Sequence, residues 1–268
     1  MQTEVHVYAL AVAASVLLSF YPFLIVILSF CRDILHWPAA VDAVYLALND
    51  YLPGDLGAFI KRNLPLRGTF QPVAMVLLLV TANGVFEPLE VALNRAWGVA
   101  ANRSYLRNQL VSLGMIFLCG GLALLSLVLT VRNDQWIGSL TGQHGHLALW
   151  MRMLIFKVAA IPIGMVALFL IYWILPNRRL SAKRLVPVAI LAGLVLEGVK
   201  YIFLLIWPFL HARVEHEYGV FRNSVTILLW AFVSALIVLA AAAWAASMEL
   251  SQNGKSPSAA STLRDPAP

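Results

Sequence analysis

The chain has 268 residues, of which 61% are hydrophobic and 12% are charged, and its formal net charge is +6. Soluble domains carry about 25% charged and about 45–50% apolar residues, so this composition excludes an ordinary soluble domain. The basic residues lie mainly between the apolar runs, where membrane orientation and lipid headgroups account for them without nucleic acid.

The apolar residues form long runs, and a helix that crosses about 30 Å of hydrocarbon needs roughly 20 residues. Inside lipid, each backbone polar group needs a partner within its own segment, which favours helices. The sequence therefore predicts an all-α polytopic membrane protein, a bundle of six transmembrane helices. In chain order the predicted spans are His6–Phe30, Gln71–Leu93, Leu106–Val131, Leu149–Leu175, Leu185–Phe209 and Ser224–Met248.

The segment between the first two spans, Arg32–Phe70, has its own pattern. Apolar residues are spaced as in a helix over Val41–Leu48 and again over Leu56–Leu64, with Pro53-Gly54 between them. This pattern predicts two short amphipathic helices in the first extracytoplasmic loop, on the outer membrane surface or capping the bundle.

The six spans predict one transmembrane domain over residues 1–248, with no second domain of any size. The remaining residues, 249–268, are rich in Ser, Pro and Ala and have little apolar surface to bury. We therefore predict that this C-terminal tail is disordered.

Basic residues crowd two of the short segments between spans. Arg95, Arg103 and Arg107 lie between the second and third spans, and Arg178, Arg179, Lys183 and Arg184 lie between the fourth and fifth. Because Lys and Arg near span ends favour the cytoplasmic side, both segments and both termini are expected in the cytoplasm. The expected location is a bacterial cytoplasmic (inner) membrane.

Several short strings carry a family resemblance. They are LLSFYPFL at 17–24, VALNRAWGV at 91–99, LPNRR at 175–179 and LEGVKY at 196–201, with Tyr218-Gly219 just before the last span. In this order they resemble the YihY/virulence factor BrkB family, formerly mislabelled ribonuclease BN, over roughly residues 8–248. The most specific match gives Asn94, Arg95, Trp97 and Gly98 as family-motif residues. The resemblance implies a six-helix inner-membrane protein for which transport is often proposed.

The second predicted span carries four polar residues at helical spacing: Asn83, Glu87, Glu90 and Asn94. Intervals of four, three and four residues place them on one side of a helix. A stripe of this kind facing lipid is unfavourable, so we expect it to face the bundle interior or a hydrated cavity. Two interpretations remain: a polar substrate pathway, or interhelical hydrogen bonding with an interfacial cap.

The fifth predicted span carries Glu197 and Lys200, which are one turn apart on one face. Opposite charges at this spacing can neutralise each other, which lowers the cost of burying either of them. The pair is interpreted either as a structural ion pair or as a switchable pair that opens for a substrate. In the second case Asn83, Glu87, Glu197 and Lys200 would together wall a polar cavity.

Motifs for catalysis or metal binding are not evident. The sequence has no GxxxxGK[ST], HExxH or GxSxG string, and the two cysteines, Cys31 and Cys119, lie in or beside apolar runs. His144 and His146 form an HxH, and His211 precedes Glu215, but solvated loop residues account for both. We expect no enzyme activity, no cofactor and no metal.

Two functions fit the sequence. The first is a transporter or flippase of an anionic or amphipathic solute or lipid. The second is a non-catalytic membrane protein that supports envelope integrity or partner assembly. The expected partners are membrane lipids and, for the first function, a small anionic or lipid substrate. Nucleic acid is not expected, and the sequence leaves a homo-oligomer open.

Overall fold

The computed structural model describes residues 5–51, 72–99, 103–141, 161–178 and 180–253. Within these ranges every regular element is a helix, which confirms the predicted all-α class. Four of the helices are long and apolar enough to cross a membrane: Val5–Ile34, Leu106–Ser126, Ala182–Tyr218 and Arg222–Glu249. Helices also occupy the described parts of the other two predicted spans, and the count of six spans stays a prediction.

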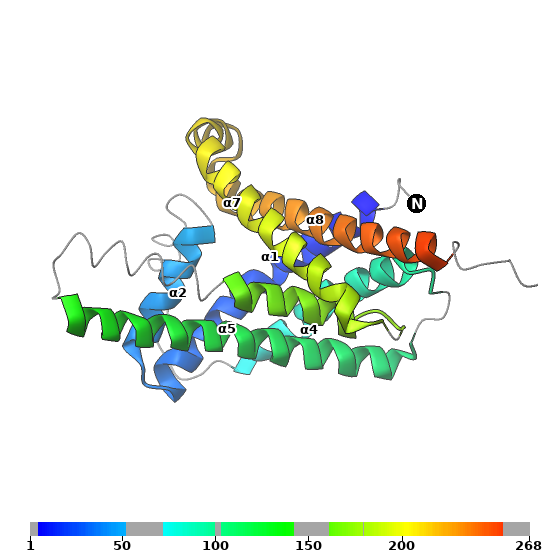
Figure 1. Cartoon of the computed structure of the whole chain (residues 1–268). Helices are drawn as coiled ribbons and strands as arrows, with labels where there is room; N and C mark the ends of the chain where they lie inside the picture. Colours follow the sequence, from blue (N-terminus) through cyan, green and yellow to red (C-terminus); the bar gives the residue numbers. More distant parts are fainter. Residues whose placement is uncertain (1–4, 52–71, 100–102, 142–160, 179, 254–268) are drawn as a thin grey trace, which may run out of the picture.

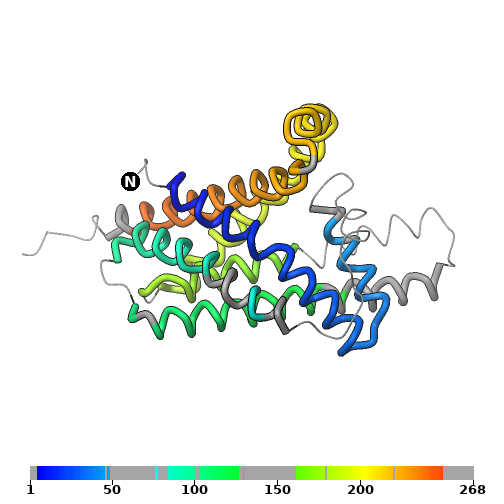
Figure 2. Tube along the Cα trace, turned by 180° about the vertical axis from the view of Figure 1, so that it is seen from behind, coloured from blue at the N-terminus to red at the C-terminus, as the bar shows by residue number. Residues whose placement is uncertain are grey.

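Helix α1 (Val5–Ser29) lies at the centre of the bundle, packed between α4 (Pro72–Ala96) and α8 (Arg222–Asn253). Figure 2 shows α1 running between these two helices along much of their length. The two helices approach closely at Gly84, where an added Cβ would lie 3.1 Å from the Oγ of Ser15. Small residues at this crossing therefore allow the two backbones to come together.

Helices α5 (Tyr105–Thr141) and α7 (Ala182–Tyr218) form the outer parts of the bundle, each with 37 residues. At 1.5 Å per residue each is about 55 Å long, which exceeds the hydrocarbon thickness of about 30 Å. Helix α7 packs on α8, and it also meets the short apolar helix Ile161–Ile174. A Cβ on Gly193 would lie only 2.8 Å from Cγ of Met165, so this contact requires glycine.

The far end of α1 changes geometry before the chain turns back. A π-helical segment, η1 (Phe30–Ile34), follows α1, and His36 then has φ +49°. Helix α2 (Pro38–Tyr51) packs against the end of α1. Its range includes the predicted helix Val41–Leu48, which is therefore present. Leu56–Leu64 lies outside the described residues, so the pair of loop helices stays a prediction.

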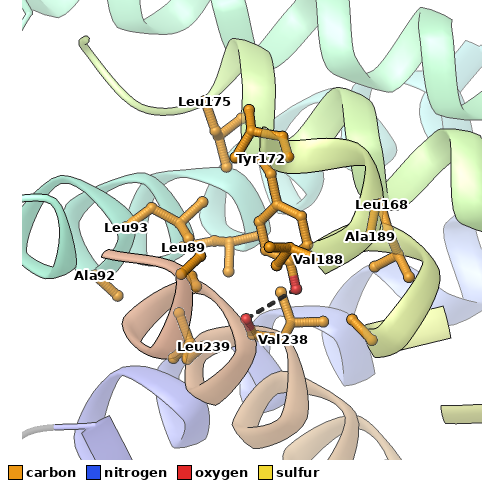
Figure 3. Close-up of a cluster of buried hydrophobic side chains, with 14 of the residues drawn as sticks. Leu89, Ala92, Leu93, Leu168, Tyr172, Leu175, Val188, Ala189, Val238 and Leu239 are labelled. Carbon is orange, nitrogen blue, oxygen red and sulfur yellow. Dashed lines mark hydrogen bonds between the residues drawn. The ribbon is translucent and has the colours of Figure 1, made fainter. Parts of the chain in front are cut away.

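The larger apolar core lies near the other end of the bundle (Figure 3). Tyr172, Leu93 and Leu175 are fully buried there, together with Leu89 and Val238 from α4 and α8. The Tyr172 hydroxyl donates to the carbonyl oxygen of Val238 at 3.0 Å, so its polar end is satisfied. This contact fixes the helix Ile161–Ile174 against α8.

Helix α8 continues past the predicted boundary at Met248 and ends at Asn253. Residues 249–253 are therefore helical, contrary to the predicted start of the disordered tail. Ion pairs of Glu249 with Arg178 and Arg184, at 3.3 and 3.9 Å, account for the extra turn. Residues 254–268 lie outside the described ranges, and their disorder stays a prediction.

Candidate functional site

The family-motif segment at 91–99 ends helix α4 with a specific cap. The N–H of Val99 donates to the carbonyl of Asn94 at 2.8 Å, and that of Gly98 donates to the carbonyl of Arg95 at 3.2 Å. These are the two hydrogen bonds of a Schellman cap, which needs a left-handed residue after the helix. Gly98 is this left-handed residue, with φ +65°. Residues with a Cβ adopt this backbone conformation only at a cost in free energy.

The motif is joined to the LPNRR segment, although about 80 residues separate them. The Asn94 side chain is 2% exposed, and its Oδ1 accepts a hydrogen bond from the backbone N–H of Asn177 at 2.7 Å. Arg178 donates to the carbonyl oxygen of Trp97 at 3.2 Å. Two of the strings that carried the family resemblance are therefore in direct contact.

A buried ion pair lies beside this junction. Nη1 of Arg103 is 3.6 Å from Oε1 of Glu90, and both side chains are less than a tenth exposed. Nη2 of Arg103 also donates to the carbonyl oxygens of Ile174 and Pro176, at 2.9 and 3.1 Å. Burying the guanidinium is costly unless such partners are present, so Arg103 connects α4 to the end of helix Ile161–Ile174.

Further contacts bring both ends of the described chain to the same place. Arg95 donates to the Tyr8 hydroxyl at 3.1 Å, and Glu249 accepts from Arg178. The start of α1, the end of α4, the start of α5 and the end of α8 therefore gather at one end of the bundle (Figure 1). We call this region the basic end. Its many arginines agree with the cytoplasmic side predicted from the sequence, and that orientation stays a prediction.

The predicted polar stripe of the second span divides in the structure. Glu90 and Asn94 are buried, while Glu87 is exposed, and the side chain of Asn83 lies outside the described set. The step from Glu87 to Glu90 is three residues, which leaves the two side chains about 60° apart around the helix. This offset separates a buried residue from an exposed one.

The Glu197–Lys200 ion pair expected from the sequence is present. Nζ of Lys200 lies 2.5 Å from Oε1 of Glu197, and the two side chains are 2% and 15% exposed. The pair belongs to α7, which packs mainly on α8, whereas α4 packs mainly on α1 and α5. The structure therefore places the α4 and α7 residues on helices that do not pack closely together. Their role in a substrate pathway stays a prediction.

A cleft of about 620 Å³, open over part of its surface, lies between the helices, and its walls are almost entirely apolar; it is called the cavity below. Side chains from α1, α2, α5, α8 and helix Ile161–Ile174 line it, and α4 contributes Leu89. The polar side chains on the wall are the hydroxyls of Ser126 and Ser234 and the thiol of Cys119, besides the indole of Trp230. Of the predicted pathway residues whose side chains the structure describes, none lines it: Glu87, Glu90, Asn94, Glu197 and Lys200. Sequence reasoning missed this cavity because its residues look like ordinary span or core positions.

His211 and Glu215, which were expected in a solvated loop, lie in the last turns of helix α7 and form a small surface cluster with Arg222. Nε2 of His211 is 3.4 Å from Oε2 of Glu215, and Nη1 of Arg222 is 2.5 Å from Oε1 of the same carboxylate. Over the described residues, no group of three or more His, Cys, Asp or Glu side chains is arranged to hold a metal ion. His144 and His146 lie outside those residues.

The fold and the buried charges define the class: a helical protein of a membrane with several apolar spans. The family described as Virulence factor BrkB matches residues 1–265, and the chain belongs to this family. No solved structure matches the chain.

Three curated relatives give the same description, each a UPF0761 membrane protein. The one from Xanthomonas campestris pv. campestris (strain B100) is 25% identical over 75% of this chain and 47% of its own length. The one from Chlorobium chlorochromatii (strain CaD3) is 26% identical over 90% of this chain and 56% of its own. The one from Stenotrophomonas maltophilia (strain K279a) is 30% identical over 65% and 39%. The chain thus spans about half the length of the curated relatives it matches.

Proposed function

We propose that this membrane protein is a transporter or flippase that moves an amphipathic, lipid-like solute in the bacterial cytoplasmic membrane, without catalysing a reaction. The cavity of about 620 Å³ between its helices is the observation that carries the proposal. Ligand sites typically measure about 300–1,000 Å³, so the volume suits a small molecule or one part of a lipid.

The apolar wall of the cavity favours an amphipathic solute over a purely anionic one, the two kinds of substrate expected from the sequence. A small anion in this cavity would lose its hydration and meet only two hydroxyls, a thiol and an indole as polar side chains. Burying an unpaired charge in such surroundings is very costly. A solute with an apolar portion fits the wall without this penalty, so the amphipathic substrate is favoured over the purely anionic one.

The charged residues Glu197 and Lys200 on α7 support the proposal that the protein moves a solute. Ionisable residues inside a membrane are expensive and commonly mark substrate or ion pathways. The Glu197–Lys200 pair is such a site, and its two charges neutralise each other while they remain in contact. In the proposed mechanism this pair opens when the polar part of the solute passes, while Asn83 and Glu87 belong to the α4 side of the route. Glu90 and Asn94, which were predicted with them, hold the basic end together instead.

A liposome assay tests the proposal. The purified protein is reconstituted in phosphatidylcholine vesicles with trace headgroup-labelled lipids, and the loss of outer-leaflet fluorescence after a membrane-impermeant quencher reports movement. Ala167 lines the cavity, whereas its neighbour Val166 is 45% exposed on the outer surface. Ala167→Phe should slow movement about ten-fold because the cavity is already walled by packed side chains. Val166→Phe, which adds bulk on the outside, should leave the rate unchanged.

A second function has its own support. The basic end is held by hydrogen bonds and ion pairs among distant segments, as a structural membrane protein requires. If the folded wild type moves no labelled lipid or amphiphile, transport fails. If Ala167→Phe is fully active, the cavity is not the route, and the observation that carries the transport proposal is lost. A non-catalytic protein that supports envelope integrity or partner assembly then replaces it.

The orientation is part of the proposal, with the basic end in the cytoplasm. Ser181 is exposed and lies at the start of α7, beside Lys183 and Arg184. In a background without Cys31 and Cys119, Ser181→Cys should resist a membrane-impermeant maleimide in intact cells and react after the membrane is opened. Strong labelling in intact cells would reverse the orientation.

A further inference from the structure

The cavity is elongated along α1. Val12 and Ile27 both line it, and at 1.5 Å per residue they lie about 22 Å apart along the helix. Apolar side chains from α5 and α8 continue the same wall beside α1. A long, apolar space of this kind differs from the compact sites with convergent polar groups that bind hydrophilic ligands.

One end of the cavity is closed by fixed structure. Leu89, Ile171 and Val238 line this end and belong to, or pack against, the main apolar core. Tyr172 lies next to Ile171 and is fully buried, with its hydroxyl donating to the carbonyl of Val238 (Figure 3). Close packing and this hydrogen bond leave no simple route through that end.

Helix α2 lines the other end of the cavity. Val44 and Leu48 of α2 line the cavity and pack in one cluster with Ile27 of α1 and Ile227 of α8. They are four residues apart, so the same face of α2 provides both contacts. Helix α2 therefore forms part of the cavity wall at the end away from the basic end.

The connection between α1 and α2 has the features of a hinge. It contains the π-helical segment η1 and His36 with φ +49°. π-Helical turns are frequently found at functional sites, and a residue with a Cβ at positive φ stores local strain. Both features lie between α1, which walls the cavity along its length, and α2, which lines one end of it.

We propose that the cavity holds one acyl chain of a membrane lipid and that α2 covers the end through which this chain enters. An acyl chain fits a long apolar wall in a membrane-embedded bundle because it carries no polar group that the wall would leave unpaired. The inference deepens the proposed function by naming the substrate class, and binding can be measured apart from movement.

Photo-crosslinking tests the occupant. Phosphatidylcholine with a diazirine in the middle of one acyl chain is incorporated into phosphatidylcholine nanodiscs that contain the protein, and adducts are mapped by mass spectrometry. We expect adducts on the inward wall around Leu122 and Ala123, and Ala123→Phe should reduce them about ten-fold. Leu125→Phe is the matched control, because Leu125 is 48% exposed on the same helix. Adducts confined to the outer surface, or unchanged in Ala123→Phe, would overturn the acyl-chain site.

A disulfide lock tests the cover. Cys31 in η1 and Ala43 on α2 are buried in the same cluster, and Ala40 of α2 also belongs to it. Ala43→Cys or Ala40→Cys should join Cys31 on mild oxidation, before the photoactive lipid is added. The locked protein should give about ten-fold fewer wall adducts, with recovery on reduction, whereas oxidised wild type should be unaffected. Equal adducts in locked and reduced protein, or failure of both variants to cross-link, would show that α2 is not the cover.

The two measurements separate the inference from the proposed function. Wall adducts without lipid movement would support the acyl-chain site and remove the transport function. Movement of a labelled amphiphile without wall adducts would keep transport and remove the acyl-chain site.

Discussion

The basic end and the cavity end of the bundle are held by different kinds of interaction. At the basic end, polar groups from α4, the segment before α5, the 174–178 turn and α8 are joined by directional contacts. At the cavity end, α2 rests on α1 through small and aliphatic side chains around a space of about 620 Å³. Directional polar contacts specify one arrangement, whereas apolar contacts beside a space permit movement at lower cost.

The largest effect should come from breaking the ion pair at the basic end. Arg103→Met leaves Glu90 buried without its cation and leaves the carbonyls of Ile174 and Pro176 without this donor. By analogy with buried pairs in soluble proteins, we expect a loss of about 3–5 kcal/mol. Unfolding in a mild detergent, followed by helical circular dichroism, would measure it.

The matched control is the double variant Glu90→Gln with Arg103→Met, which removes both charges and should recover part of the stability. If Arg103→Met melts like the wild type, the contact does not hold the basic end together, and the contrast between the two ends disappears.

Breaking the Glu197–Lys200 ion pair on α7 should also lower the free energy of unfolding, but by less than breaking the Glu90–Arg103 pair. Lys200→Met leaves Glu197 unpaired, but both residues belong to one helix, whereas the Glu90–Arg103 pair joins two segments. We expect a loss of about 3 kcal/mol, at the lower end for buried pairs. Glu197→Gln combined with Lys200→Met should recover most of it in the same detergent melt. Two silent single variants would show that the pair contributes nothing to stability.

Two leucine truncations compare the packed core with the cavity wall directly. Leu93 is fully buried in the main core, and Leu93→Ala should cost about 3 kcal/mol because it creates a new void. Leu48 of α2 already borders the cavity, so Leu48→Ala should cost only about 1 kcal/mol. Equal losses in thermal melts would mean that the α2 end is packed as tightly as the core.

The smallest effect concerns the motif glycine. Gly98→Ala places a Cβ at φ +65°, which should cost about 1 kcal/mol although no atom lies within contact range of that Cβ. Gly114→Ala on α5 meets equally open space inside a helix and should instead stabilise by about 0.5–1 kcal/mol. If the two variants shift the melting temperature in the same direction, the cap geometry at Gly98 is not what the motif preserves.

The sequence by itself determined the membrane class, the all-α fold, the family resemblance and the Glu197–Lys200 ion pair. These follow from properties that a chain carries locally: long apolar runs force helices in lipid, and opposite charges one turn apart meet on the same face. The family motif at 91–99 was also visible, because it is a continuous string.

Tertiary structure decided what those local features do. The sequence could not show that Asn94 and Trp97 contact the 177–178 turn, since nothing in either string specifies its partner. Helical spacing grouped Glu87 with Glu90, but packing of α4 buried one and exposed the other. The cavity depends most on the assembled bundle, because an apolar side chain that borders a space has the same sequence signature as one that fills it.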